Sequence, residues 1–172
     1  TSRGFYLRDL GMYFVIGDYF DIALTGDIYT LGSWAVDVNS RYKVNYKFNG
    51  NLSITYSNDQ TGERGSTDFF QTRNFGVRWS HSQDSKARPG TTFSASVNFS
   101  SPSNNKYNAT SVTEALQNQI SSSISYSKNW NGKMNLSINA LHSQNSRDSS
   151  YSFTLPNITF SVNRFYPFKR QN

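Results

Sequence analysis

The sequence predicts an all-β fold, an antiparallel up-and-down meander that forms part of a transmembrane β-barrel of the outer-membrane type. The first observation is an alternation of apolar and polar residues that recurs along most of the 172-residue chain. Because successive strand side chains point to opposite faces, each run has one apolar and one polar face. The second is the length of the runs, mostly about 10 to 12 residues. A tilted membrane strand needs roughly nine to eleven residues, whereas ordinary strands average about five or six.

Alternation and flanking turn residues mark about nine strands. They span residues 5–16, 19–30, 34–44, 48–57, 72–82, 91–101, 118–129, 133–143 and 151–164. The second strand shows the pattern, because Phe20, Ile22 and Leu24 are separated by Asp21 and Ala23. Apolar positions recur in the same way at Trp34, Val36, Val38, Phe75, Val77, Trp79, Phe93, Val97, Phe99, Ile120, Ile124, Tyr126, Met134, Leu136 and Ile138.

The predicted turns keep the apolar face continuous from strand to strand. A three-residue loop over 45–47 leaves Val44 and Phe48 on one face, whereas a two-residue loop would set Lys47 among apolar neighbours. The same parity is expected for a three-residue turn at 130–132, which would leave Asn129 facing Lys133 on the polar side. These parities favour one continuous meander.

The connections alternate in length, and this alternation orients the sheet. They are tight near 17–18, 45–47 and 130–132 and long at 58–71 and 102–117. Outer-membrane barrels have short periplasmic turns and longer external loops, so the two long loops are expected outside the cell. We interpret 1–172 as a segment of a single barrel domain, cut from a longer protein.

Two local signals depart from regular strands. Residues 111–117 have helical spacing and are expected to form a short helical turn inside a loop. Pro156 donates no ladder hydrogen bond, so it marks a strand start, an edge or a bulge.

Composition narrows the function classes. Cysteine is absent, which excludes disulfides and zinc–thiolate sites. The net charge of +6 is scattered without a basic run or a nucleic-acid-binding motif, so no nucleic-acid partner is expected. No nucleophile elbow, paired carboxylate, metal-ligand spacing or phosphate-binding glycine loop is present, and therefore neither an enzyme nor a cofactor site is expected.

The polar face is the expected lumen wall of such a barrel. It carries Asp21, Thr25, Asp27, Asp37, Asn39, Arg41, Lys43, Asn51, Ser53, Thr55, Arg78, Ser94, Ser96, Ser123, Ser125, Asn135, Ser137 and Asn139. Aromatic residues near strand ends are candidates for interfacial girdles. They are Tyr29, Trp34, Tyr42, Tyr46, Phe48, Tyr56, Trp79, Tyr126 and Trp130.

Three stretches resemble the barrel region of LptD, also called OstA, in its Bacteroidetes-type form. They are residues 19–30 (YFDIALTGDIYT) with the following Gly-Ser-Trp at 32–34, residues 122–128 (SSISYSK), and residues 155–169 (LPNITFSVNRFYPFK). The Tyr-Pro-Phe-Lys ending at 166–169 is the most distinctive part.

The resemblance implies an outer-membrane barrel that inserts lipopolysaccharide into the outer leaflet. Such a barrel works with an LptE-like lipoprotein plug and a periplasmic Lpt bridge, and it lies in outer-membrane lipid. Candidate lumen-facing contacts for an anionic glycolipid are Arg41, Lys43, Arg73 and Arg78, which can pair with phosphates or acidic sugars. Solvated lumen or rim charge is the other explanation for these four residues.

Two other functions fit the same pattern. One is a different outer-membrane barrel, such as a porin or a TonB-dependent receptor. The other is a soluble β-sandwich that acts as a carbohydrate-binding or adhesin module. Because a segment with two unpaired edges is prone to aggregate, we expect that these 172 residues do not fold alone.

Overall fold

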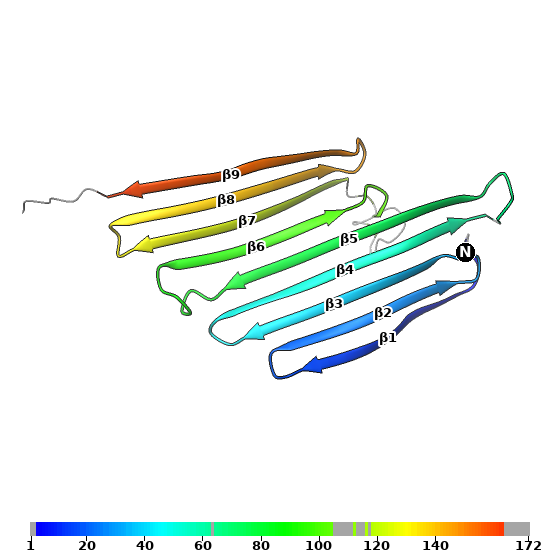
Figure 1. Ribbon diagram of the computed structural model, residues 1–172, viewed down its shortest axis with the longest axis horizontal. Helices are drawn as coiled ribbons and strands as arrows, with labels where there is room; N and C mark the ends of the chain where they lie inside the picture. Colours follow the sequence, from blue (N-terminus) through cyan, green and yellow to red (C-terminus); the bar gives the residue numbers. More distant parts are fainter. Residues whose placement is uncertain (1–2, 63, 105–111, 113–115, 117, 164–172) are drawn as a thin grey trace, which may run out of the picture.

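The computed structural model describes residues 3–62, 64–104, 112, 116 and 118–163. They form nine antiparallel strands in one sheet, ordered as in the sequence (Figure 1). The strands are β1 (Tyr6–Ile16), β2 (Phe20–Tyr29), β3 (Trp34–Val44), β4 (Phe48–Thr61), β5 (Phe70–Gln83), β6 (Thr91–Ser100), β7 (Gln119–Trp130), β8 (Met134–Asn145) and β9 (Ser150–Val162). The predicted all-β up-and-down meander is therefore confirmed.

Three-residue turns set the register, as the parity argument requires. Val44 pairs with Phe48 across the turn 45–47, in which Tyr46 has a positive φ of 61°. The turn between β7 and β8 is shifted by one residue from its predicted place, because Trp130 pairs with Met134. Asn129 consequently faces Asn135 instead of Lys133. The reason is local: Asn131 and Gly132 both adopt positive φ, which a tight hairpin turn demands.

The fourth connection is shorter than predicted. The loop expected over 58–71 is confined to 62–69, because β4 and β5 pair over their full 14 residues, from Phe48↔Gln83 to Thr61↔Phe70. The polar residues 58–60, which suggested a loop, continue the strand ladder instead. Strand pairing joins backbone N–H and C=O groups, so polar side chains do not prevent it. Asn58 accepts a hydrogen bond from Gln71 at 2.6 Å, so the polar side chains also pair with each other.

The connections follow the predicted asymmetry of the two ends only in part, because 84–90 is longer than 30–33 and 146–149 at the opposite end. One end carries turns 17–19, 45–47, 84–90 and 131–133, and the other carries 30–33, 62–69, 101–118 and 146–149. The helical turn expected over 111–117 lies, apart from Val112 and Leu116, outside the described residues. Within the described residues, no helix has the length and apolar character to cross a membrane.

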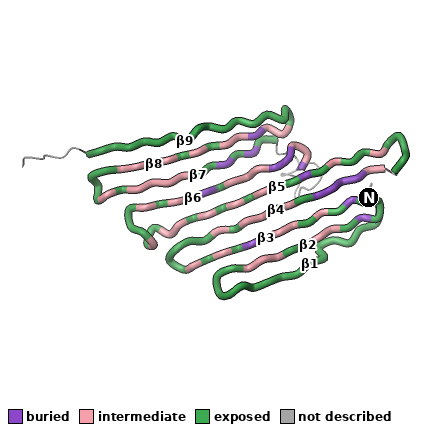
Figure 2. The backbone as a smooth tube through the Cα atoms, in the orientation of Figure 1, coloured by how far each residue is buried: buried purple, intermediate pink, exposed green. Residues whose placement is uncertain are grey.

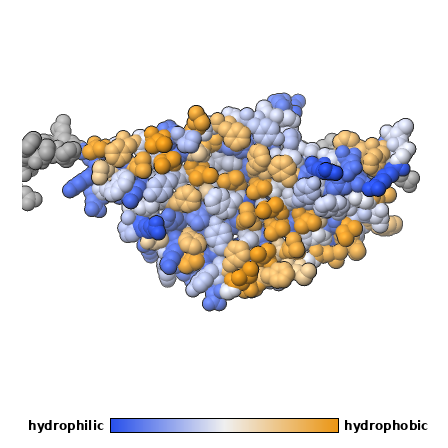
Figure 3. Space-filling model, viewed as in Figure 1, coloured by the Kyte–Doolittle hydropathy of each residue, from blue (hydrophilic) through white to orange (hydrophobic). Residues whose placement is uncertain are grey.

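Burial in this sheet is the reverse of a soluble domain. Large apolar side chains are exposed, among them Leu24 at 37% and Phe14 at 47%. Polar residues are buried instead, including Ser57, Asn74 and Gln144, and they gather toward the end with the long connections (Figure 2). Hydrophobic side chains spread across the side of the sheet drawn in Figure 3. Nothing in the described chain covers this apolar face, which is the arrangement of a barrel wall turned toward lipid.

Aromatic rings gather in three places on the apolar face, one of which joins Phe75, Phe99, His142, Tyr151 and Phe153. Near the long connections, the rings of Trp34 and Tyr56 lie 5.6 Å apart. Toward the tight turns, His81 contacts Tyr42, Phe48, Trp79 and Phe93. The girdle prediction is wrong for Tyr29, which is 6% exposed and pairs in register with Tyr6 on the opposite, polar side. Tyr29 directly follows Ile28 in β2, so its side chain points to the opposite face from the outward-facing Ile28.

Both edge strands contain a bulge. In β1 the register shifts between Leu7 and Leu10, and in β9 two residues, Leu155 and Pro156, lie opposite Ala140. Pro156 therefore sits in an edge-strand bulge, as its missing N–H predicts. Among the described strands, β1 and β9 each pair on one side only, so the sheet does not close.

Side-chain hydrogen bonds continue the contact between β6 and β7 where their backbone pairing stops; we call this boundary the seam. β5 pairs with β6 only over Gly76–Ser82, and β6 pairs with β7 only over Thr91–Ser96. Beyond this stretch the Ser122 hydroxyl accepts a hydrogen bond from the Asn98 N–H at 2.8 Å and donates to the Asn98 carbonyl at 2.7 Å. Side-chain groups thus replace the ladder where β6 and β7 diverge.

The two faces make opposite predictions for a charged substitution. Ile54 lies mid-strand on the apolar face between Val38 and Val77, while its neighbour Ser53 lines the polar face. In the full-length protein folded in lipid vesicles, Ile54→Arg should lower the free energy of unfolding by about 2–4 kcal/mol, the cost of a cation against the bilayer centre. Ser53→Arg should cost much less, as measured by guanidinium titration. Equal losses would contradict the assignment of faces.

Candidate functional site

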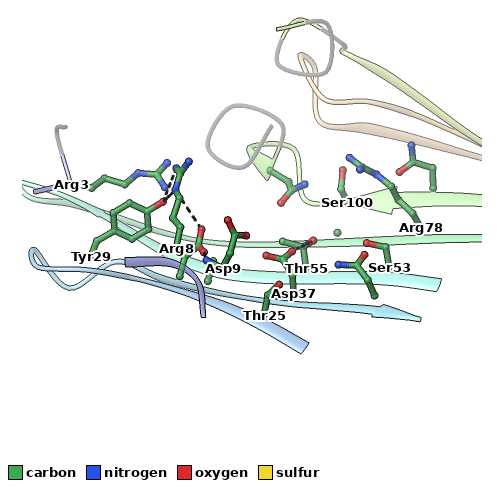
Figure 4. Close-up of a pocket in the computed structure, with 16 residues that line it drawn as sticks. Arg3, Arg8, Asp9, Thr25, Tyr29, Asp37, Ser53, Thr55, Arg78 and Ser100 are labelled. Carbon is green, nitrogen blue, oxygen red and sulfur yellow. Dashed lines mark hydrogen bonds and ion pairs between the residues drawn. The ribbon is translucent and has the colours of Figure 1, made fainter. Parts of the chain in front are cut away.

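The polar face contains a cavity of about 530 Å³ that crosses from β1 to β6 (Figure 4). Side chains of both charges project into it, with Arg3, Arg8 and Tyr29 together at one end and Arg78 and Ser100 at the other. Its lining consists of Arg3, Arg8, Asp9, Thr25, Asp27, Tyr29, Ala35, Asp37, Asn39, Ser53, Thr55, Gly76, Arg78, Asn98, Ser100 and Asn104.

The bulge in β1 supplies one end of this cavity. Arg8 and Asp9 both lie opposite Asp27, so two consecutive side chains line the same space. Asp9 adopts φ 56°, and its N–H donates to Asp27 Oδ1 at 3.0 Å. Arg8 Nε lies 3.6 Å from Asp27 Oδ2. The bulge therefore brings a cation and two carboxylates together, which a regular strand cannot do from consecutive positions.

Tyr29 is the buried centre of this end. Arg8 donates to the Tyr29 hydroxyl from Nη2 at 2.9 Å and from Nε at 3.1 Å. The Arg3 guanidinium lies 5.4 Å from the centre of the same ring, within cation–π range. One aromatic side chain thus holds two arginines beside the cavity.

A buried hydrogen-bond network continues from Arg3. Arg3 Nη1 lies 2.9 Å from Oδ1 of Asp59, which is 3% exposed. Asp59 Oδ2 accepts from Ser57 at 2.6 Å and from Asn74 at 2.7 Å. Asn74 Oδ1 accepts in turn from Ser101 at 3.2 Å. The network joins the residues before β1 to β4, β5 and the first residues of the longest connection.

A second cavity of about 530 Å³ lies toward the tight turns and includes Asp21, Arg41 and Lys43 in its lining. Arg41 Nε lies 3.4 Å from Asp21 Oδ1, and the Arg41 side chain is 72% exposed. Because this pair is exposed, it contributes little to stability, and the Arg41 guanidinium stays accessible to an anion.

Three of the four predicted site residues share the polar face. Arg41 and Lys43 lie in the second cavity and Arg78 lies in the first. Arg73 does not join them: it pairs with Asn58 and shares the parity of Phe75, so it points to the apolar face. The prediction that Arg73 faces the lumen is therefore wrong, because a side chain five residues from Arg78 falls on the other side of a strand.

The polar face changes character across the sheet. On β1 to β5 it is charged, whereas on β6 to β9 the register places only neutral side chains there. Hydroxyls pair across the strands, as between Ser94 and Ser125 at 2.8 Å. A cavity of about 330 Å³ on this half includes Ser96, Ser121 and Ser143 in its lining.

Sequence reasoning found Arg78 but missed the other two arginines of the first cavity, Arg3 and Arg8. Arg3 and Arg8 lie before and within a bulge, where period-two counting fails. Asp59, the centre of the buried network, fell inside the stretch 58–71 that was assigned to a loop, although its partner Asn74 lay in a predicted strand. The available signal was the parity of Tyr29, an aromatic residue among the polar-face positions of β2.

Within the described residues, no group of three or more His, Asp or Glu side chains is arranged to hold a metal ion. His81 and His142 instead contact aromatic rings, with the His142 ring 4.7 Å from that of Phe153.

The chain was compared with known protein families, curated proteins and solved structures. The family described as "LptD protein" matches residues 1–172. No curated protein and no solved structure matches the chain.

The network makes a prediction about Asn74, which is fully buried. Asn74→Ala removes one donor from the Asp59 carboxylate and leaves Ser101 without its acceptor. We expect the free energy of unfolding of the full-length protein to fall by about 1–3 kcal/mol, the usual cost of an unsatisfied buried polar group. Asn139→Ala is the matched control, since Asn139 is exposed and its side chain donates to Ser137, an exposed contact outside the buried network. A similar loss in both variants would contradict a structural role for the network.

Proposed function

The chain belongs to the LptD family, and from this premise we propose that it forms part of the outer-membrane barrel that inserts lipopolysaccharide into the outer leaflet. The observation that carries the proposal is the reversed burial of the sheet: exposed apolar side chains on one face and charged cavities on the other. Such a wall separates lipid from a wet lumen.

The two halves of the polar face suit the two parts of a glycolipid head. Phosphates and acidic sugars are anions that arginine binds by paired hydrogen bonds. Arg41, Lys43 and Arg78 on the charged half are the proposed contacts for these groups. Neutral sugars offer hydroxyls, which the serine-rich half matches with donors and acceptors of its own.

The carboxylates beside these cations also support transport over tight binding. Of the proposed contacts, Arg41 lies beside Asp21, so an incoming phosphate must compete with a resident anion there, and Arg8 on the same face likewise lies beside Asp27. Competition of this kind weakens each contact and allows the cargo to leave, as conduction through a pore requires.

We further propose the partners that this function requires. A periplasmic Lpt bridge would deliver the lipid at the end with the tight turns, and an LptE-like lipoprotein would fill the lumen against the polar face. The apolar face would contact outer-membrane lipid. No enzymatic step and no cofactor are part of the proposal.

The competing functions have less support. A soluble β-sandwich requires two packed sheets, whereas the described strands form one sheet with an uncovered apolar face. The family match favours lipopolysaccharide transport over a porin or a TonB-dependent receptor.

Photocrosslinking in living cells tests the proposal. A photoreactive residue placed at Arg41 or Arg78 of the full-length protein should form an adduct with lipopolysaccharide, detected as a slower band that an anti-lipopolysaccharide antibody stains. The same residue at Phe48, exposed on the apolar face near a tight turn, should give an adduct at least several-fold weaker. Equal adducts at all three positions, or none at the two lumen positions, would overturn the proposed role.

A further inference from the structure

We propose that Arg73 binds the phosphate groups of glycolipids in the outer leaflet, from the lipid side of the barrel wall. Its place in the sheet is the first ground. Trp34, Asn58 and Arg73 lie in one cross-strand row, one outward-facing position beyond Tyr56 and Phe75. The Trp34 and Tyr56 rings are in tilted contact, 5.6 Å apart, and aromatic side chains of this kind form the girdles at the level of the head groups. Arg73 is therefore level with the head groups at the end that carries the long connections.

On β4 and β5 the outward face becomes polar at this row, whereas on β1, β2 and β3 the same row presents the exposed apolar side chains of Leu7, Ile28 and Trp34. Below it, β4 and β5 present Ile54, Tyr56, Phe75 and Val77 to the lipid. Above it the outward pair is Gln60 and Gln71, and Gln71 donates to Asn58 at 2.6 Å. On these two strands the apolar band ends at Arg73, and both 14-residue strands continue past it.

The charge of Arg73 is unmatched within the described part of the chain. Arg3, Arg8 and Arg41 each lie beside a carboxylate, at 2.9 to 3.6 Å. The exposed Arg73 has no such ion pair and no hydrogen-bond partner there. A cation facing lipid without an internal anion is stabilised by an anion of the membrane itself. Phosphate fits best, because the planar guanidinium binds two of its oxygens at once.

The opposite rim offers a matched control. Lys128 also faces outward, in the row of Leu136 and Phe160, and its Nζ lies 4.9 Å from the centre of the Trp130 ring. It lies near the tight turn 131–133, level with the inner leaflet. A phosphorylated glycolipid confined to the outer leaflet does not reach Lys128.

The test measures the lipid that the full-length protein retains. The protein is purified in mild detergent directly from the asymmetric outer membranes of cells that make bisphosphorylated lipid A, or of cells in which a lipid A phosphatase removes the phosphates, and native mass spectrometry counts the lipid A bound per barrel. The wild type should retain the bisphosphorylated form preferentially. Arg73→Gln should reduce that preference about tenfold, consistent with the loss of a charge-assisted hydrogen bond. Arg73→Lys should fall between the two, since it keeps the charge but not the paired geometry.

Lys128→Gln should leave the preference unchanged. Wild-type retention by Arg73→Gln, or an equal loss in Lys128→Gln, would overturn the proposal. Heat-induced mobility shift on gels verifies that each variant is folded, and Arg73→Lys serves if Arg73→Gln does not fold. The proposal uses the membrane orientation of the proposed function but not transport. If lumen crosslinks fail while Arg73→Gln still loses lipid A, the transport role is wrong and the lipid contact stands.

Discussion

The structure depends on one constraint: a strand in a bilayer has no water to bond its N–H and C=O groups, so every one of them needs a partner in the sheet. Regular antiparallel pairing over 9 to 14 positions meets this need for most neighbouring strands. Once the backbone is paired, the period-two alternation leaves each strand with one side for lipid and one for water. The apolar wall and the charged cavities are thus two results of the same ladder.

Most of the charged side chains that interact with one another lie where the regular strand ladder is interrupted or extended. The bulge in β1 places Arg8 and Asp9 beside Asp27 on one face. The long pairing of β4 with β5 brings Asp59 and Asn74 into hydrogen-bond contact in a buried network. Both features lie at the end with the long connections. At the other end, three of the four turns have three residues and the register stays regular, so the charged residues there act singly or in the simple pair of Arg41 and Asp21.

The strands, their order and their two faces could be predicted from the sequence, because alternation and turn length depend on residues that are close together in the chain. The face of Arg73 was within its reach, since the predicted strand 72–82 contains both residue 73 and Phe75, which share parity. Arg3, Arg8 and the cavity around Tyr29 were not predictable, because a bulge breaks the count and only three-dimensional pairing shows where.

At the seam between β6 and β7, a side-chain hydroxyl makes hydrogen bonds that backbone groups make elsewhere in the sheet. Ser122 serves a backbone donor and a backbone acceptor of Asn98 at once, and Gln144 reaches the carbonyl of Ser100 at 2.6 Å. Elsewhere a side chain can change while the main chain keeps its bonds. Along this line the main chain relies on side chains, so the identity of residues 122 and 144 is as constrained as that of a core position in a soluble domain, although neither is apolar.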